Sequence, residues 1–442
     1  MKTNTIVSTV FLGFCLAGTC LEIYASQDTT PQKLVPTVTH SLRDAYLAAL
    51  KTSETLNVQK ELVVQADEGL SQANGALYPT ISGSYSFLNQ ATPSSVTGSA
   101  IFPASQSTGR LTLTQPLFRG LRDFAALRQK RFLVGSQLGA YQVAARQLFY
   151  DVATAYYNVL IYQSDVKNYE AVIEVNLKRL KELDRFFKIG RAQLTDVLTF
   201  KSSIASVEAQ LEVSRGQVES AKEVLAYLTG WDRNTSLSDD EPHLLQLESA
   251  GTYVAQIENR PEIKAALENL SANHEFIPIS WGAHLPSLDL IGNYYLVRPG
   301  VLKDVNWDVQ VALTFPIFQG GVVQSQVRQA ESVVRQYDLV LSQTRRVAEQ
   351  EIRVFYNSVL ADSKQFSKLK ELVSVAKQNA DTEVKYYRNG LVTNLDVLNA
   401  MTTYQDAQRQ MDRQSYAFKL DTVKLKAATG QRPEIGVTHP QH

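Results

Sequence analysis

Cysteine is nearly absent from this chain, and neither sign of charge is in excess. The two cysteines, Cys15 and Cys20, both lie near the N-terminus. If that segment is removed, the rest of the chain can hold neither a disulfide nor a thiolate metal site. The 44 acidic and 44 basic residues balance, and the lysines and arginines are scattered. The composition therefore offers no basic face for nucleic acid.

Motifs for catalysis are also lacking. The six histidines are scattered, and no two of them stand at the spacing of metal ligands. The sequence contains no P-loop, no G-x-S-x-G motif and no carboxylate pair placed by a recognisable motif. We therefore expect a protein that is not an enzyme and that binds neither a cofactor nor a metal.

Long apolar runs occur only at the N-terminus. Residues 1–25 combine Lys2, an apolar stretch and the small residue Ala25, a pattern that predicts a secretory signal peptide. Lipidation of Cys20 is the alternative, but Thr19 stands where a bacterial lipobox normally has Gly, Ala or Ser. Beyond this segment no run approaches the ~20 apolar residues of a transmembrane helix. We infer that the chain, if it crosses a membrane, does so as a β-barrel.

The stretch Tyr386–Tyr404 indicates a sharp reversal between two helices. Gly390 readily adopts the positive φ that ends a helix. Thr393, followed three residues later by Asp396, is the pattern of a capping box that opens the next helix. We therefore predict a tight helix–turn–helix at this point.

This reversal has a counterpart earlier in the chain. Phe187–Phe200 repeats the pattern, with Gly190 and Asp196 in the places of Gly390 and Asp396. Further landmarks recur at the same spacing: Pro116/Pro316, Phe118/Phe318, Gly120/Gly320, Arg128/Arg328, Gln129/Gln329 and Thr229-Gly230/Thr429-Gly430. We interpret the chain as one unit of about 200 residues present twice, a period too long for a solenoid.

The duplication predicts the domain organisation. The expected segments are a signal peptide (1–25), a first repeat (26–230), a connector (231–250), a second repeat (251–430) and a C-terminal tail (431–442). Each repeat contains a helix, a β-hairpin, a long helix, a reversal and a returning helix. Both long helices would extend roughly 100 Å, because the rise is 1.5 Å per residue.

The first repeat is expected to begin with one helix over 41–74 and a hairpin at about 80–118. A loop over 89–108 divides this hairpin, and the motif at 115–120 ends its second strand. The long helix reaches Lys188, and the reversal lies at about 188–195. In the second repeat we expect a helical segment over 253–276 whose main part starts at 259–262, a hairpin at about 287–318, a long helix to Tyr387 and a reversal at about 388–395.

The clearest strand pattern is in the second hairpin, where apolar and polar residues alternate from Val305 to Phe315. Alternation of this kind is typical of an outer-membrane barrel, and it also occurs in a half-buried strand of a soluble sandwich. The signal peptide and the two hairpins with long loops favour the barrel. The residues that we predict to face lipid are Trp307, Val309, Val311, Leu313 and Phe315.

Four strands cannot close a barrel alone, and an open sheet edge does not survive in lipid. The missing strands must therefore come from other copies of the chain. Two copies would give about eight strands and a filled interior, whereas three copies give twelve strands with room for a channel. We predict a homotrimer in which a ring of helices continues the barrel. A fibrous coiled coil is the alternative, against which the paired hairpins and the prolines argue.

Several motifs together resemble the TolC-type outer membrane efflux protein family, over essentially the whole mature chain. They are Ala76-Leu77-Tyr78-Pro79, Leu113-Thr114-Gln115-Pro116-Leu117-Phe118, Leu285-Pro286-Ser287-Leu288, Ala312 to Gly321, and Gly390 to Asn399. The resemblance implies a trimeric twelve-stranded outer-membrane barrel joined to a long periplasmic α-helical tunnel. It also implies that the helix reversals close the tunnel and contact a periplasmic adaptor protein and, through it, an inner-membrane transporter of the RND or ABC type.

The resemblance assigns a periplasmic gate to the reversals. It places Asp396 in the narrowest ring of the tunnel, with Asn399 where the family archetype has a second carboxylate. The residues that correspond to the archetype's latch are Thr195, Asp196 and Tyr387. The tips Gly190, Gly390 and Leu391 are the expected adaptor contacts. The simpler interpretation is that both aspartates only cap helices.

One position departs from the family pattern of the latch. The archetype's latching arginine is replaced by Val392, and Arg388 and Arg191 are the candidate substitutes. We also expect mutual repulsion in a ring of Asp396 carboxylates to favour protonation of at least one of them.

The sequence thus predicts the exit duct of a tripartite efflux pump that exports small molecules and has no energy source of its own. One alternative is the exit duct of a type I protein secretion system, which would use the same scaffold. Another alternative, from a different class, is a periplasmic coiled-coil structural protein without a pore. The outer membrane, with a long periplasmic extension, is the expected location.

Overall fold

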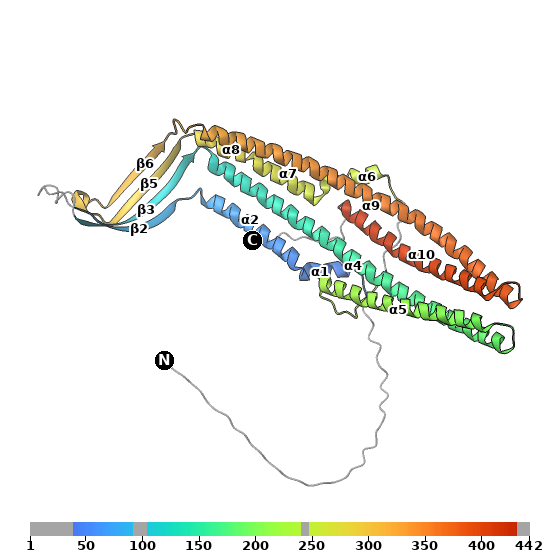
Figure 1. Cartoon of the computed structure of the whole chain (residues 1–442). Coiled ribbons are helices and arrows are strands. Elements are labelled where there is room, and N and C mark those ends of the chain that lie inside the picture. Colours follow the sequence, from blue (N-terminus) through green and yellow to red (C-terminus); the bar gives the residue numbers. More distant parts are fainter. Residues whose placement is uncertain (1–38, 92–103, 240–246, 431–442) are drawn as a thin grey trace, which may run out of the picture. The chain divides into compact units, whose positions relative to one another are not determined.

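The computed structural model describes residues 39–91, 104–239 and 247–430. The predicted signal peptide and C-terminal tail lie outside these residues. The described chain is mainly helical, with a four-stranded sheet at one end of the helices and both helix reversals at the other (Figure 1). The predicted mixed, mainly α fold is confirmed.

The sheet consists of two hairpins side by side. Its strands are β2 (Thr80–Asn89), β3 (Ser105–Arg119), β5 (Ser287–Val297) and β6 (Trp307–Thr314), which are hydrogen-bonded in that order. Every neighbouring pair is antiparallel. The two hairpins are thus joined by the pairing of β3 with β5, and β2 and β6 form the edges of the sheet.

Two strand ends differ from the prediction. β3 continues through Pro116 and most of the motif at 115–120 that was expected to end it, and reaches Arg119. The register with β5 shifts between Pro116 and Phe118, and such an irregularity accommodates a residue that lacks a backbone N–H. β6 ends at Thr314, so Phe315 lies just outside the strand in which it was predicted.

Four long helices contain more than half of the residues that the structure describes. α4 (Arg122–Lys188) and α9 (Val322–Arg388) have 67 residues each and therefore extend roughly 100 Å. α5 (Leu194–Thr229) returns along α4, and α10 (Asn394–Ala428) returns along α9 (Figure 1). These are the helical hairpins that the duplicated sequence predicts.

The single N-terminal helix predicted over 41–74 was wrong. The segment forms α1 (Leu42–Thr52) and α2 (Glu54–Gly75), which are separated by Ser53 in an extended conformation. The Ser53 hydroxyl accepts a hydrogen bond from the backbone N–H of Leu56 (3.2 Å), so the same residue ends one helix and caps the next. Because of this break, α1 and α2 do not continue as one straight helix.

The helical segment expected over 253–276 is divided more finely than predicted, although its main helix does begin within 259–262. Its parts are α6 (Ala250–Val254), the short 3-10 turn η1 (Ile257–Asn259), α7 (Pro261–His274) and α8 (Phe276–Trp281). A second 3-10 turn, η2 (Gly282–His284), leads to β5. Pro261 begins α7, where its missing N–H costs no helical hydrogen bond.

The connector between the repeats holds a strand that its polar composition did not predict. β4 (Ser236–Leu237) pairs in parallel with β1 (Thr39–His40). The Tyr156 hydroxyl donates to the carbonyl oxygens of His40 (2.9 Å) and Ser238, and so fixes this pair to α4. The two ends of the first repeat therefore meet beside the same long helix.

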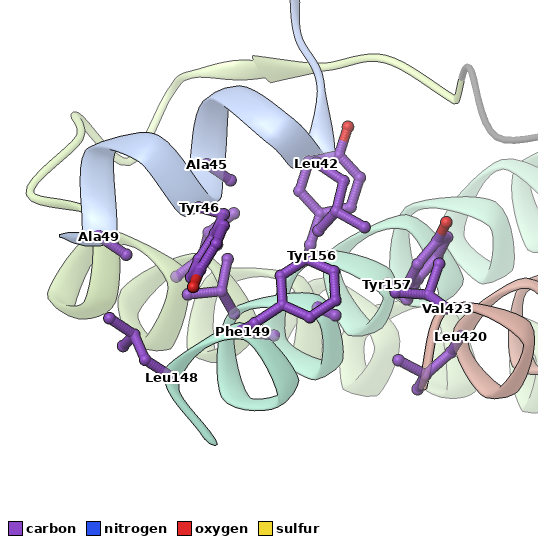
Figure 2. Packing of buried hydrophobic residues seen from close by; sticks show 14 of the residues in the cluster. Leu42, Ala45, Tyr46, Ala49, Leu148, Phe149, Tyr156, Tyr157, Leu420 and Val423 are labelled. Atoms are coloured by element: carbon purple, nitrogen blue, oxygen red, sulfur yellow. The ribbon is translucent and has the colours of Figure 1, made fainter. Parts of the chain in front are cut away.

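The largest apolar cluster of the described residues lies where α1 packs on α4 and α5 of the first hairpin (Figure 2). Tyr46 of α1 packs edge-on against Phe149 of α4 at 4.9 Å between ring centroids, and its hydroxyl donates to the Ala145 carbonyl at 2.9 Å. Leu420 and Val423 bring α10 into the same cluster. One core thus joins helices of both repeats.

A buried charge network braces α4, α7 and α9. Arg260 is completely buried; its guanidinium donates to Glu262, to Glu351 and to the Ala348 carbonyl. Arg146 of α4 binds Glu262 with both terminal nitrogens, at 2.8 and 3.0 Å. Two arginines and two glutamates balance, which is how buried ions are tolerated.

The helices α4 and α7 approach each other closely at Gly139. A Cβ atom built on Gly139 would lie 2.6 Å from the Cβ of Ala265 and 3.0 Å from its Cα. Both neighbouring atoms are close to a helix backbone, so they cannot move aside independently. We expect Gly139→Ala to destabilise the fold by about 1–3 kcal/mol.

Gly69→Ala in α2 is the matched control, because nothing lies within 4 Å of a Cβ at that helical position. It should instead stabilise its helix by about 0.5–1 kcal/mol. Thermal unfolding of the helical circular dichroism signal in detergent compares the two variants. Equal midpoints for both variants would contradict the close packing of α4 and α7.

Candidate functional site

The two reversals have nearly the same backbone geometry. Gly190 and Gly390 have φ values of 73° and 74°, in the left-handed region that favours glycine. The following N–H groups, of Arg191 and Leu391, reach back to the carbonyls of Phe186 (2.8 Å) and Tyr386 (3.0 Å). This closes the ends of α4 and α9 in the manner of a Schellman motif. Each reversal is exposed, and Leu391 projects at the tip of the second one.

The helices that leave the reversals begin with capping boxes. The Thr393 hydroxyl donates to the Asp396 carboxylate at 2.6 Å, and the backbone N–H of Asp396 donates to the Thr393 hydroxyl at 3.3 Å. This capping box is confirmed. In α5, Gln193 occupies the cap position and its N–H donates to Asp196 at 3.0 Å. Thr195 is exposed and its hydroxyl donates to the Gln193 side chain.

The carboxylate of Asp396 is stabilised in its ionised form. Hydrogen bonds from the side chain and backbone of Thr393 lower the pKa of Asp396 below its ordinary value. This local effect opposes the protonation that was predicted from repulsion within a ring. Asn399 lies three residues further along α10 and is likewise exposed, so both side chains are on one face of the helix.

An apolar cluster lies behind the two reversals. It contains Leu183, Val197, Phe200 and Ile204 of the first hairpin and Ala380, Val397, Ala400 and Met401 of the second. Tyr387 and Val392 pack against this cluster. The residue that replaces the latching arginine of the family archetype is therefore part of an apolar contact between the hairpins.

Of the two candidate substitutes for that arginine, Arg388 makes a contact between the hairpins. Its Nη2 lies 2.9 Å from Oε1 of Glu182 on α4. Arg179, one turn earlier on α4, binds the other oxygen of Glu182 at 2.6 Å, and its guanidinium stands 4.8 Å from the centre of the Tyr387 ring. Sequence reasoning missed Arg179 and Glu182, because no motif or periodicity marks them.

Burial raises the pKa of Glu182, but the hydrogen bonds and positive charges of Arg179 and Arg388 outweigh it. The net effect holds the pKa of Glu182 below its ordinary value. For a lowered carboxyl pKa, the stabilisation is complete above the ordinary value and is lost only as the pH falls through the lowered one. The contact between the hairpins is therefore intact at neutral pH.

One face of the sheet is continuously apolar and exposed. The register aligns Ile81 with Leu113, Leu111 with Tyr294, Leu290 with Val311, and Tyr294 with Trp307. Val309, Val311 and Leu313 of β6 are each more than 60% exposed. Four strands thus present an apolar surface that no described residue covers.

The other face of the sheet is polar. The Thr112 hydroxyl donates to Asn293 at 2.9 Å, and Asn293 donates to Asp308 at 2.8 Å, so a hydrogen-bonded row crosses three strands. Serines 82, 84 and 86 of β2 also lie on this face. The two faces therefore suit two different surroundings, one apolar and one aqueous.

In the helices that the structure describes, no segment is apolar enough over a sufficient length to span a membrane. Within the same residues, no group of three or more His, Cys, Asp or Glu side chains is arranged to hold a metal ion.

A two-faced sheet, long paired helices and an internal duplication define the class of outer-membrane channel proteins with a helical periplasmic part. The family model described as "Outer membrane efflux protein" matches residues 45–231 and 253–431. The chain belongs to this family. Its location is the outer membrane, with the helices in the periplasm.

The curated relatives include both efflux and secretion proteins. The outer membrane protein TolC of Escherichia coli strain K12 is 27% identical over 74% of this chain and 70% of its own length. The outer membrane efflux protein BepC of Brucella suis is 24% identical over 89% and 86%. The alkaline protease secretion protein AprF of Pseudomonas aeruginosa is 22% identical over 72% and 69%.

A solved structure of CusC has the same fold, with a TM-score of 0.79 over 89% of this chain and 92% of that chain, at 17% identity. The fold and the family are thus shown, whereas the gate and lipid-facing residues remain predictions.

The exposed face of β6 leads to a test of its orientation. Val311→Arg places a charge on the apolar face and should impair assembly in the membrane by about 2–4 kcal/mol, if the residue lies near the midplane. Gln310→Arg, on the opposite face of the same strand, should assemble normally. Recovery of heat-resistant oligomer from outer membranes measures both variants. Normal assembly of Val311→Arg would contradict the predicted orientation.

Proposed function

We propose that this protein is the passive exit duct of a tripartite efflux pump, gated at its periplasmic end. The observation that carries this proposal is the connection of a two-faced sheet to helices of roughly 100 Å, whose reversals lead to Asp196, which is half-buried, and Asp396, which is exposed. A lipid-embedded sheet of this kind gives the export route its outer end. The helices would carry the route across the periplasm.

The sheet edges support a trimer. β2 and β6 each have one hydrogen-bonded neighbour among the described strands, and a lipid-embedded edge needs a second one. Pairing of β6 of one copy with β2 of the next would close a barrel. Twelve strands leave room for a lumen lined by the polar face, whereas eight do not.

The helices also have exposed apolar residues that would support association of several copies. Val340, Val347 and Val354 recur every seven residues on α9, and all three are exposed in the single chain. On α5, Val213, Val224 and Tyr227 are also exposed. Apolar residues at heptad spacing are typical of a helix–helix seam, and α5 of a neighbouring copy would cover the α9 seam.

This trimer seam can be tested apart from the barrel. Val347→Lys would bury a charge between copies and should shift the purified protein from trimer towards monomer. Ser342→Lys is the control, because that serine is exposed on another side of α9. Light scattering in detergent measures the mass of each variant. A fully trimeric Val347→Lys would argue against this seam.

Asp396, with Asn399 and Asp196, is proposed as the polar lining of the gate, and three copies of Asp396 would attract cations. Asp396→Asn keeps an oxygen that can cap α10 while removing the charge. In planar bilayers under a cation gradient, we expect Asp396→Asn to lower cation selectivity and Asn399→Asp to raise it. Unchanged selectivity in both variants would leave Asp396 as a helix cap only.

The proposed partners are a periplasmic adaptor protein at the tips Gly190, Gly390 and Leu391, and an inner-membrane transporter of the RND or ABC type. The similarity to the outer membrane efflux protein BepC supports efflux, and the similarity to the alkaline protease secretion protein AprF supports protein secretion, here of type I, as the second candidate. Complementation of a strain that lacks its own duct would separate them. Restored drug resistance without restored protein secretion supports efflux, and the reverse result supports secretion.

A further inference from the structure

The contact between the two hairpins at their tips is built differently from the pattern that the family resemblance implies. Position 392 holds a valine that packs into the apolar cluster, so it contributes no charge. Asp196, the acid expected to receive an arginine, caps α5 through the backbone of Gln193. The charged contact between the hairpins is instead centred on Glu182 of α4.

Both oxygens of the Glu182 carboxylate are occupied by arginines. Oε2 accepts from Arg179 of the same helix at 2.6 Å, and Oε1 accepts from Arg388 of α9 at 2.9 Å. Arg388 is in the last turn of α9, immediately before the second reversal. One carboxylate therefore ties the end of the second hairpin to the long helix of the first.

Tyr387 adds a second contact at the same place. Its ring lies under the Arg179 guanidinium at 4.8 Å and beside the Phe186 ring at 6.2 Å. A cation over an aromatic face is attracted by the ring quadrupole. Tyr387 and Arg388 are neighbours in α9, so two consecutive side chains engage α4.

Burial of Arg179 makes this arrangement dependent on Glu182. Arg179 is only 5% exposed, and its Nε and Nη2 have no hydrogen-bond partner among the described residues. Its charge is therefore balanced by Glu182 and the Tyr387 ring. If Glu182 lost its charge, Arg179 would be a buried cation close to Arg388, and the two positive charges would repel each other.

We propose that Glu182 is the positioning residue that holds the periplasmic gate closed, by bridging Arg179 and Arg388 across the two hairpins. This inference rests on the proposed gated duct. Opening requires the Arg388–Glu182 contact to break so that the second hairpin can move away from α4. A partner that docks on the exposed tips would open the duct by drawing Arg388 away from Glu182.

The test is single-channel recording of the purified full-length protein in planar bilayers. Glu182→Gln should raise the open probability on the order of tenfold, which corresponds to about 1.4 kcal/mol shared among three copies of an exposed ion pair. Arg388→Gln should have a similar effect. Because both variants break the same contact, the double variant should open no more than either single variant.

Glu174→Gln is the matched control. Glu174 is on the same helix and forms an ion pair with Lys178 at 2.6 Å, the length of the Arg179–Glu182 pair, but it touches no residue of the second hairpin through that pair. Its open probability should equal that of the wild type. Glu182→Asp keeps the charge and should restore part of the closure, and a heat-resistant trimer in every variant establishes that the fold is intact.

The outcomes separate this proposal from the proposed duct. A wild type with small, brief openings and a Glu182→Gln variant that opens more supports both. A conducting wild type with unchanged Glu182→Gln overturns the role of Glu182 and leaves the duct in place. Equal opening by Glu174→Gln, or additive effects of Glu182→Gln and Arg388→Gln, also overturns it. Trimers that never conduct in any variant overturn the duct, and the latch with it.

Discussion

The structure depends on one constraint: backbone N–H and C=O groups at a sheet edge in lipid must be paired. The sheet of β2, β3, β5 and β6 that the structure describes cannot meet this constraint alone, and one of its faces is apolar and exposed. The duplication links the sheet to the helices, because each hairpin is followed by a 67-residue helix and a reversal. Closing the strands of several copies, as proposed above, would therefore also arrange their helices around a common axis.

Much of this fold could be predicted because periodic patterns of residues in the sequence indicate its strands and helices. Alternation identified the strands, and the positive-φ glycines and the Thr393–Asp396 capping pair identified the end of α9 and the start of α10. The errors occurred where one residue overrides a pattern. Ser53 breaks a helical run by capping, and Pro116 remains in a strand because the register shifts beside it. The β1–β4 pair depends on a tertiary contact with Tyr156, which no local pattern reveals.

The functional residues were predictable to a smaller extent, for a related reason. Asp396 and Asp196 stand at fixed distances from glycines and could be found by motif. Glu182 and Arg179 lie within a helix rich in charged residues, where one acid looks like any other until the facing helix is known. Val392 indicated that an arginine was missing but could not indicate its replacement. Single charged contacts between distant segments carry no sequence period.

The two repeats share their backbone conformation at the reversals but differ in the side chains beside them. Both reversals have the same glycine geometry, yet Glu182 corresponds by position to Thr382, and Arg179 to Asn379. The acid and its buried arginine thus belong to the first hairpin alone, and the exposed cation Arg388 belongs to the second. An ion pair between unlike hairpins can break by moving one hairpin while the other stays fixed. Since the charge network of Arg146, Glu262 and Arg260 braces α4, α7 and α9 far from the tips, such a movement would be confined to the helix ends.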